Sequence, residues 1–271
     1  MKFKNEKITA KVASSFISLE QAELNLSREI GTDTFDQTKT KAAVLWNTEL
    51  GRIEIEGGTV EQYRTFYTAL YRVLLFPRKF YELNVDNEIV HYSPYNGEVL
   101  PGYMFTDNGF WDTFRAVFPF FTIMYPDYTS QIMQGLVNTY NESGWLPEWA
   151  SPGHRDCMVG SNSAINIADA YLRGIRGYDI ETLYEAIIKN SNSVGPLNSV
   201  GRYGAEYYND IGYIPYDVGV NENAARTLEY AFADWSISEL GVALNKPKLE
   251  IDLYRNRSLN YTHLFDPEIG F

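Results

Sequence analysis

The sequence predicts a mainly α-helical protein whose helices pair as hairpins around a partial toroid. Apolar residues recur at helical spacing through most of the chain after Thr59. The connections between these helices alternate between tight and long, and the long ones hold most of the aromatic and polar side chains. Because long loops at one rim of a toroid build a pocket, we expect the functional site there. About seven such helices are expected, fewer than a closed barrel needs.

The N-terminal part is expected to hold a short strand and three helices. Residues 7–17 alternate loosely and predict the strand, and a helix follows from Ser18. A second helix is predicted over 35–50, followed by a short strand where Ile53 and Ile55 alternate with charged residues. Thr59 can cap the third helix, with Gln62 three residues further on.

Helices alternating with irregular stretches are predicted for the rest of the chain. Residues 78–106 are expected to be loop or short strand. The predicted helices cover 110–124, 126–142, 163–175, 180–191, 222–244 and 248–259, and the irregular segments between them are 144–160 and 192–221.

Composition excludes several partners. The net charge is −12 and the pI about 4.8, which argues against nucleic acid or an anionic membrane surface as a partner. The single cysteine, Cys157, excludes an internal disulfide and is expected to be a small buried residue. No segment has the length and hydrophobicity of a membrane span, and residues 1–20 show no export signal.

Aromatic and polar residues concentrate between Pro101 and Asp169. Sugars are bound by aromatic faces that stack on their C–H surfaces and by planar polar groups that bind their hydroxyls. This stretch therefore predicts a carbohydrate pocket. The candidate residues are Trp111, Trp145 and Trp149 together with Asp112, Arg115, Glu148 and His154.

Two of these groups can also be interpreted without a functional role. In a helix, Trp111 and Arg115 share a face as a sugar clamp would require, but Asp112 and Arg115 could equally form a simple surface ion pair. Glu148 lies between Pro147 and Trp149, where aromatic surface would raise its pKa towards that of a general acid. Composition alone favours a solvated loop carboxylate.

A third cluster surrounds the start of the predicted helix at Glu222. Asn221, Glu222 and Asn223 offer oxygen ligands of the kind that Ca²⁺ prefers. The same residues would also serve as helix caps, with Asn221 as the cap residue. Zinc-protease, P-loop and dinucleotide motifs are absent from the sequence, so those chemistries have no support.

Five stretches resemble glycoside hydrolase family 92, the calcium-dependent, inverting exo-α-mannosidases. They are SFISLEQAELNLSREI, LGRIEIEGGTVEQYRTFYTALYRVLLFPR, FWDTFRAVFPFFTIMYPD, SGWLPEWASPGHRDCMVGSNSAINIADAYLRGI and GYIPYDVGVNENAARTLEYAFADWSISELG. The resemblance implies a β-sandwich whose last strand is residues 1–17, linker helices and a short strand over 18–58, and an incomplete (α/α)6 domain over 59–271.

The same resemblance implies roles for individual residues. Trp111, Asp112 and Arg115 would line the mannose subsite, and Glu148 would be the general acid, with Asp156 in the same loop as the alternative. Asn221 would contact the leaving group and Glu222 the calcium ion. Val220 and Asn221 replace the His-Glu pair associated with α-1,2 linkages, which argues against that specificity.

The family's GNDD-type motif, which would carry the general base, has no counterpart in these residues. We therefore expect a mannosidase fragment with Ca²⁺ as cofactor and a mannose-containing glycan, such as an N-glycan, as partner, and little activity by itself. The alternatives are a glycan-binding chain without catalysis and a helical-toroid polysaccharide lyase. The family implies a periplasmic or extracellular location.

Overall fold

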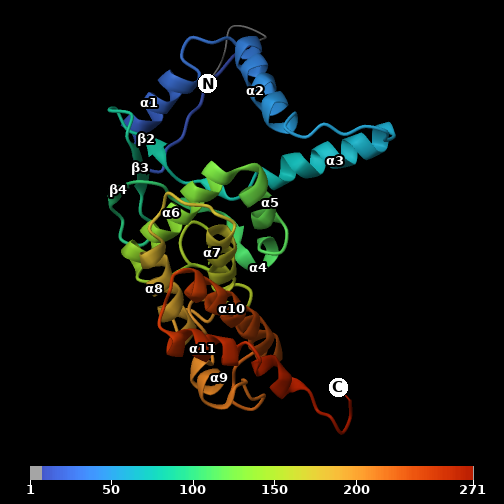
Figure 1. The fold of residues 1–271 in the computed structure, drawn as a ribbon. Coiled ribbons are helices and arrows are strands. Elements are labelled where there is room, and N and C mark those ends of the chain that lie inside the picture. Colours follow the sequence, from blue (N-terminus) through green and yellow to red (C-terminus); the bar gives the residue numbers. More distant parts are fainter. Residues whose placement is uncertain (1–7, 271) are drawn as a thin grey trace.

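The computed structural model describes residues 8–270. The molecule is elongated. The N-terminal helices lie at one end, a body of packed helices forms the middle, and the C-terminal helices lie at the other end (Figure 1). In the described part of the chain, no helix is long and apolar enough to cross a membrane. The mainly helical class is confirmed, and the partial toroid remains a prediction.

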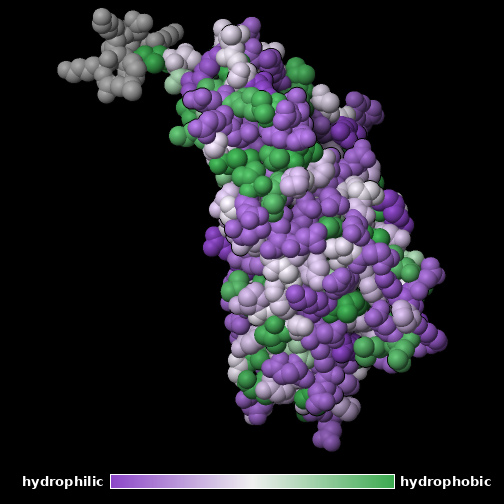
Figure 2. Space-filling view, turned by 90° about the vertical axis from the view of Figure 1, so that its left-hand side faces the viewer, coloured by the Kyte–Doolittle hydropathy of each residue, from purple (hydrophilic) through white to green (hydrophobic). Residues whose placement is uncertain are grey.

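Each N-terminal helix is preceded by a serine or threonine whose side chain caps its first turn. These helices are α1 (Leu19–Glu29), α2 (Phe35–Leu50) and α3 (Val60–Val73). Thr34 and Gln37 form a capping box at α2, and Thr59 and Gln62 form another at α3. The face seen in Figure 2 carries apolar patches towards this end of the molecule.

Two predicted strands are wrong where the structure describes them. Residues 8–17 and the segment around Ile53 and Ile55 have no strand partner, although both alternate in sequence. Alternation predicts which side chains would share a face of a strand. A strand also needs an adjacent strand with which its backbone N–H and C=O groups can form hydrogen bonds. Residue 7 lies outside the described chain.

Short antiparallel strands occupy parts of residues 78–106, where loop or short strand was expected. β2, β3 and β4 form a three-stranded sheet, β1 pairs with β5, and β6 pairs with β7. Their bounds are β1 (Arg78–Lys79), β2 (Glu82–Leu83), β3 (Ile89–Tyr92), β4 (Val99–Pro101), β5 (Phe105–Thr106), β6 (Asn108–Gly109) and β7 (Trp149–Ala150).

The helical body extends from α4 to the end of the described chain. Its elements are α4 (Phe110–Thr113), α5 (Val117–Met124), α6 (Pro126–Ser143), α7 (Asn162–Leu172), α8 (Ile180–Asn192), α9 (Ala205–Ile211), α10 (Asn223–Ala243), α11 (Lys248–Arg257) and the 3₁₀ helix η1 (Asn260–Leu264). The single helix predicted over 110–124 is divided between α4 and α5, and α9 was not predicted. Most other bounds agree within a few residues.

One apolar core holds this body together. It includes Phe121, Met133, Ile167 and Leu183, all of which are fully or almost fully buried. Helix α10 packs on α7 and α11, and α6 packs on α5 and α8. The three helices α5, α7 and α10 consequently present side chains to a common groove, which positions the candidate site.

Candidate active site

The β6–β7 pair joins two parts of the site that are distant in sequence. Gly109 pairs with Trp149, and the backbone N–H of Phe110 donates to the carbonyl of Glu148 at 3.0 Å. A Cβ at Gly109 would lie 1.9 Å from Cε3 of Trp149, so the indole requires glycine there. The start of α4 is thereby fixed beside Glu148.

Glu148 is a buried carboxyl at the N-terminus of α7. It is 3% exposed, and Ser163 contacts both of its oxygens: the backbone N–H at 2.9 Å and Oγ at 2.6 Å. Burial raises the pKa of Glu148 from 4.5 to about 8, while the two Ser163 hydrogen bonds act in the opposite direction. The solvated loop carboxylate favoured by composition is therefore wrong: Glu148 keeps its proton at neutral pH.

A buried ion pair lies next to this carboxyl. Nη2 of Arg202 is 2.6 Å from Oδ1 of Asp234, and neither side chain is exposed. Nε of Arg202 also donates to Ser161, the residue before α7, at 3.0 Å. The positive charge of Arg202 contributes to lowering the pKa of Glu148. The pair connects the start of α7 to α10, and its effect on the pKa of Glu148 is smaller than that of burial or of the Ser163 hydrogen bonds.

Arg115 pairs with a carboxylate that the sequence analysis did not single out. Its Nη2 lies 3.1 Å from Oε1 of Glu229 on α10, and no ion pair joins it to Asp112, so the i, i+3 alternative is wrong. Nη1 donates to the carbonyl of Trp111 at 2.6 Å, and the guanidinium lies 4.3 Å from the ring centre of Phe114. Because α4 ends at Thr113, Arg115 lies beyond the helix, and Asp112 is exposed.

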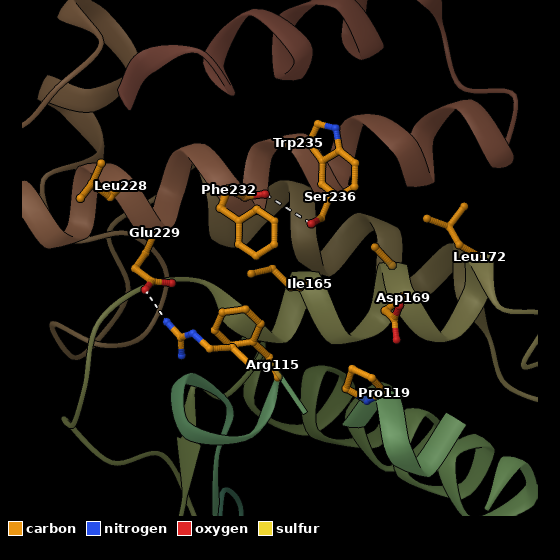
Figure 3. Close-up of a pocket in the computed structure, with 12 residues that line it drawn as sticks. Arg115, Pro119, Ile165, Asp169, Leu172, Leu228, Glu229, Phe232, Trp235 and Ser236 are labelled. Atoms are coloured by element: carbon orange, nitrogen blue, oxygen red, sulfur yellow. Dashed lines mark hydrogen bonds and ion pairs between the residues drawn. The ribbon is translucent and has the colours of Figure 1, made fainter. Parts of the chain in front are cut away.

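Arg115 and Glu229 lie at one end of a groove of about 500 Å³. Figure 3 shows the two side chains facing each other, with Ile165 and Phe232 next along the groove and Trp235 further on. Its walls come from the segment around α4 and α5, from α7 and from α10. Glu148 does not line this groove, so the acid and the arginine occupy separate parts of the site.

The other predicted aromatic and histidine contacts are only partly accessible. The ring of Trp145 is 4.5 Å from Nζ of Lys189, and Trp149 packs on Gly109. Nε2 of His154 lies 3.1 Å from Oγ of Ser143. Burial lowers the pKa of His154 to about 4, so this imidazole is neutral at physiological pH.

The residues predicted for the leaving group and calcium lie elsewhere on the surface. Asn221 is exposed, and its side-chain oxygen and carbonyl both accept hydrogen bonds from Arg226. Glu222, not Asn221, occupies the cap position of α10, with a φ of 54° and no capping hydrogen bond from its side chain. Its carboxylate lies 3.7 Å from Arg226.

These residues do not form a calcium site by themselves. Among residues 8–270, no three acidic, histidine or cysteine side chains gather in a way that could hold a metal ion. Ca²⁺ needs six or more oxygen ligands, whereas Asn221 and Glu222 are directed at Arg226.

Comparison with known proteins identifies the family. Residues 21–271 match the model of the glycosyl hydrolase family 92 catalytic domain. A family GH92 inverting mannosidase of Bacteroides thetaiotaomicron is similar over 95% of this chain, with 51% identity and a TM-score of 0.92. A family GH92 α-mannosidase of the same organism, in complex with mannoimidazole, covers 95% of the chain with 27% identity and a TM-score of 0.83.

An uncharacterized secreted glycosidase of Arthroderma benhamiae is 31% identical over 96% of the chain. This chain belongs to glycosyl hydrolase family 92. It spans about a third of the length of these relatives: 35% and 33% of the two mannosidases and 30% of the secreted glycosidase.

Proposed function

We propose that this chain carries the acid half of an α-mannosidase site, with Glu148 as the general acid that protonates the departing oxygen of a terminal α-linked mannose. The supporting observation is the environment of Glu148, a buried carboxyl whose pKa of about 8 keeps it protonated at neutral pH. Trp111, Asp112 and Arg115 would bind the mannose, and Trp145, Trp149, His154 and Asn221 are proposed as further contacts.

The two contacts from Ser163 suit a carboxyl that gives up a proton and regains it. Burial stabilises the neutral acid before transfer. After transfer, the N–H and the hydroxyl of Ser163 both point at the carboxylate, which also lies at the positive end of the α7 dipole. Both protonation states of Glu148 are thus accommodated without rearrangement.

An inverting glycosidase also needs a general base on the opposite face of the sugar, roughly 6.5–9.5 Å from the acid. The family 92 relatives are about three times as long as the segment they share with this chain. We propose that the base and the Ca²⁺ site, including the contact expected from Glu222, are completed by further polypeptide. These 271 residues alone should then release mannose slowly or not at all. The relative described as secreted supports a periplasmic or extracellular location.

The function is tested by mannoside binding and turnover, each compared between the wild type and Glu148→Gln. We expect tryptophan fluorescence to report binding of methyl α-mannoside to both proteins, weakened in Trp111→Ala. Released mannose should stay near background. Rapid turnover that survives Glu148→Gln would exclude the acid role, and release of an ultraviolet-absorbing unsaturated product would indicate a lyase. Binding with no turnover, even when the remaining family 92 segments are supplied, would indicate a glycan-binding chain.

The raised pKa of Glu148 also predicts a pH dependence of stability. The folded state holds this proton more tightly than the unfolded chain, so the Glu148 carboxyl contributes fully to the free energy of unfolding below pH 4.5. This contribution is lost as pH rises towards 8. The free energy of unfolding should fall over this interval in the wild type and fall less in Glu148→Gln. Urea denaturation at pH 5, 7 and 9 measures both slopes, and equal slopes would contradict the shifted pKa.

A further inference from the structure

Glu229 is a partly buried carboxylate that connects α10 to the segment carrying Trp111 and Arg115. Its side chain is 16% exposed, and its only ion pair in the described chain is with Arg115. Burial raises the pKa of Glu229, while the charge of Arg115 and the neighbouring Trp111 act in the opposite direction. The carboxylate therefore pairs with Arg115 and lies near Trp111, two of the residues that are proposed to bind the sugar.

The backbone of a neighbouring loop holds Glu229 in place. A Cβ built on Gly160 would lie 3.0 Å from Cβ of Glu229 and 2.6 Å from Nδ2 of Asn162. Gly160 also has a φ of +92°, which favours glycine. Glu229 is thus packed against the loop that leads into α7, and its position is set by three segments: this loop, α10 and the residues after α4.

Arg115 would be mobile without this partner. Its side chain is 52% exposed, and long exposed side chains sample many rotamers. It contacts the ring of Phe114, the carbonyl and ring of Trp111, and the carboxylate of Glu229. Of these contacts, Glu229 is the one that comes from a distant segment, α10. Because a guanidinium has five N–H donors, some remain for a ligand at the end of the groove (Figure 3).

We propose that Glu229 is a positioning residue: it holds the Arg115 guanidinium beside Trp111 in the orientation that binds a sugar hydroxyl. The inference rests on the mannoside site proposed above. Fixing the arginine before binding removes part of the ordering cost that the ligand would otherwise meet. Glu229 acts through Arg115 and does not itself react with the substrate.

The first experiment needs no ligand. Side-chain ¹⁵N NMR reports the mobility of the Arg115 Nε–H group, with Arg115→Lys used to assign the signal. We expect Glu229→Ala to increase this mobility and Glu229→Gln, which keeps an acceptor, to restore part of the order. Glu239→Ala is the matched control, because Glu239 also lies on α10 and pairs with a different arginine, Arg255, at 3.4 Å. Unchanged mobility in folded Glu229→Ala would overturn the proposal.

The second experiment measures methyl α-mannoside affinity in a double-mutant cycle. Glu229→Ala should weaken binding by about tenfold in the wild type and cause little further loss in Arg115→Ala. Equal losses in both backgrounds would show that Glu229 does not act through Arg115. If the wild type binds no mannoside while Glu229→Ala still releases Arg115, the mannoside function fails and the positioning role stands.

Discussion

The N-terminal helices and the helical body are stabilised in different ways. Helix α2 has no buried residue, and α1 and α3 have one each, Gln21 and Leu70. In α7, by contrast, eight of eleven residues are buried. Capping boxes define the starts of α2 and α3, whereas Ser161 before α7 makes no side-chain cap. The first region therefore depends on local interactions and the second on packing.

The candidate site lies in the region that depends on packing. Each of its defining contacts joins distant segments: Glu148 to Ser163, Arg115 to Glu229, and Arg202 to Asp234. A local cap fixes the end of one helix, but catalysis needs side chains held in place relative to other helices. Mutations should consequently have large effects in the body and small effects in the N-terminal helices.

The largest effect is expected from Asp234→Ala. This change leaves Arg202 buried without its partner, and removing one member of a buried pair costs about 3–5 kcal/mol of unfolding free energy. The matched change on the same helix, Glu239→Ala, removes an exposed pair with Arg255 and should cost at most about 1 kcal/mol. Urea denaturation measures both. Similar losses in the two variants would show that burial does not determine how much the Arg202–Asp234 pair contributes to stability.

A smaller effect is expected from truncating the core. Ile167 on α7 is fully buried, and Ile167→Ala should lower the unfolding free energy by about 2–5 kcal/mol. Leu45 on α2 is 69% exposed, so Leu45→Ala should stay within about 0.5 kcal/mol. The same denaturation series measures both. A large loss of unfolding free energy in Leu45→Ala would indicate that this face of α2 is buried against another surface in solution.

The sequence predicted helices best where the signal is local. Thr34 and Gln37 lie at the start of a periodic run, and α2 has the predicted bounds. The break between α4 and α5 was missed because the run Phe110–Met124 is mostly apolar and has no proline or glycine at Phe114–Ala116. The alternation in residues 8–17 predicted a strand but did not identify the neighbouring strand, and none pairs with these residues in the described chain. The β-sandwich and toroid assignments remain predictions.

The sequence suggested candidate site residues, but it did not show which side chains they pair with. The neighbours Pro147 and Trp149 suggested desolvation of Glu148 whereas composition favoured a solvated carboxylate, and the burial of Glu148 contradicts the second interpretation. Spacing suggested Asp112 as the partner of Arg115, but the pairing is with Glu229, 114 positions further along. Only the fold brings these two together. A glutamate within the largely apolar run LEYAFAD was the one available signal.

The smallest effect is expected at a helix cap. Thr34→Ala removes one half of the α2 capping box and should cost about 1 kcal/mol of local helix stability. Hydrogen exchange should become faster over 35–50 and stay unchanged over α7, because α2 contributes no buried residue to the body. Thr40→Ala is the control: it makes the same change of side chain but removes a hydroxyl that donates within the helix, to the carbonyl of Asp36 at 2.9 Å. Faster exchange in α7 as well would show that the two regions unfold together, and the stabilities of cap and core could then no longer be treated as independent.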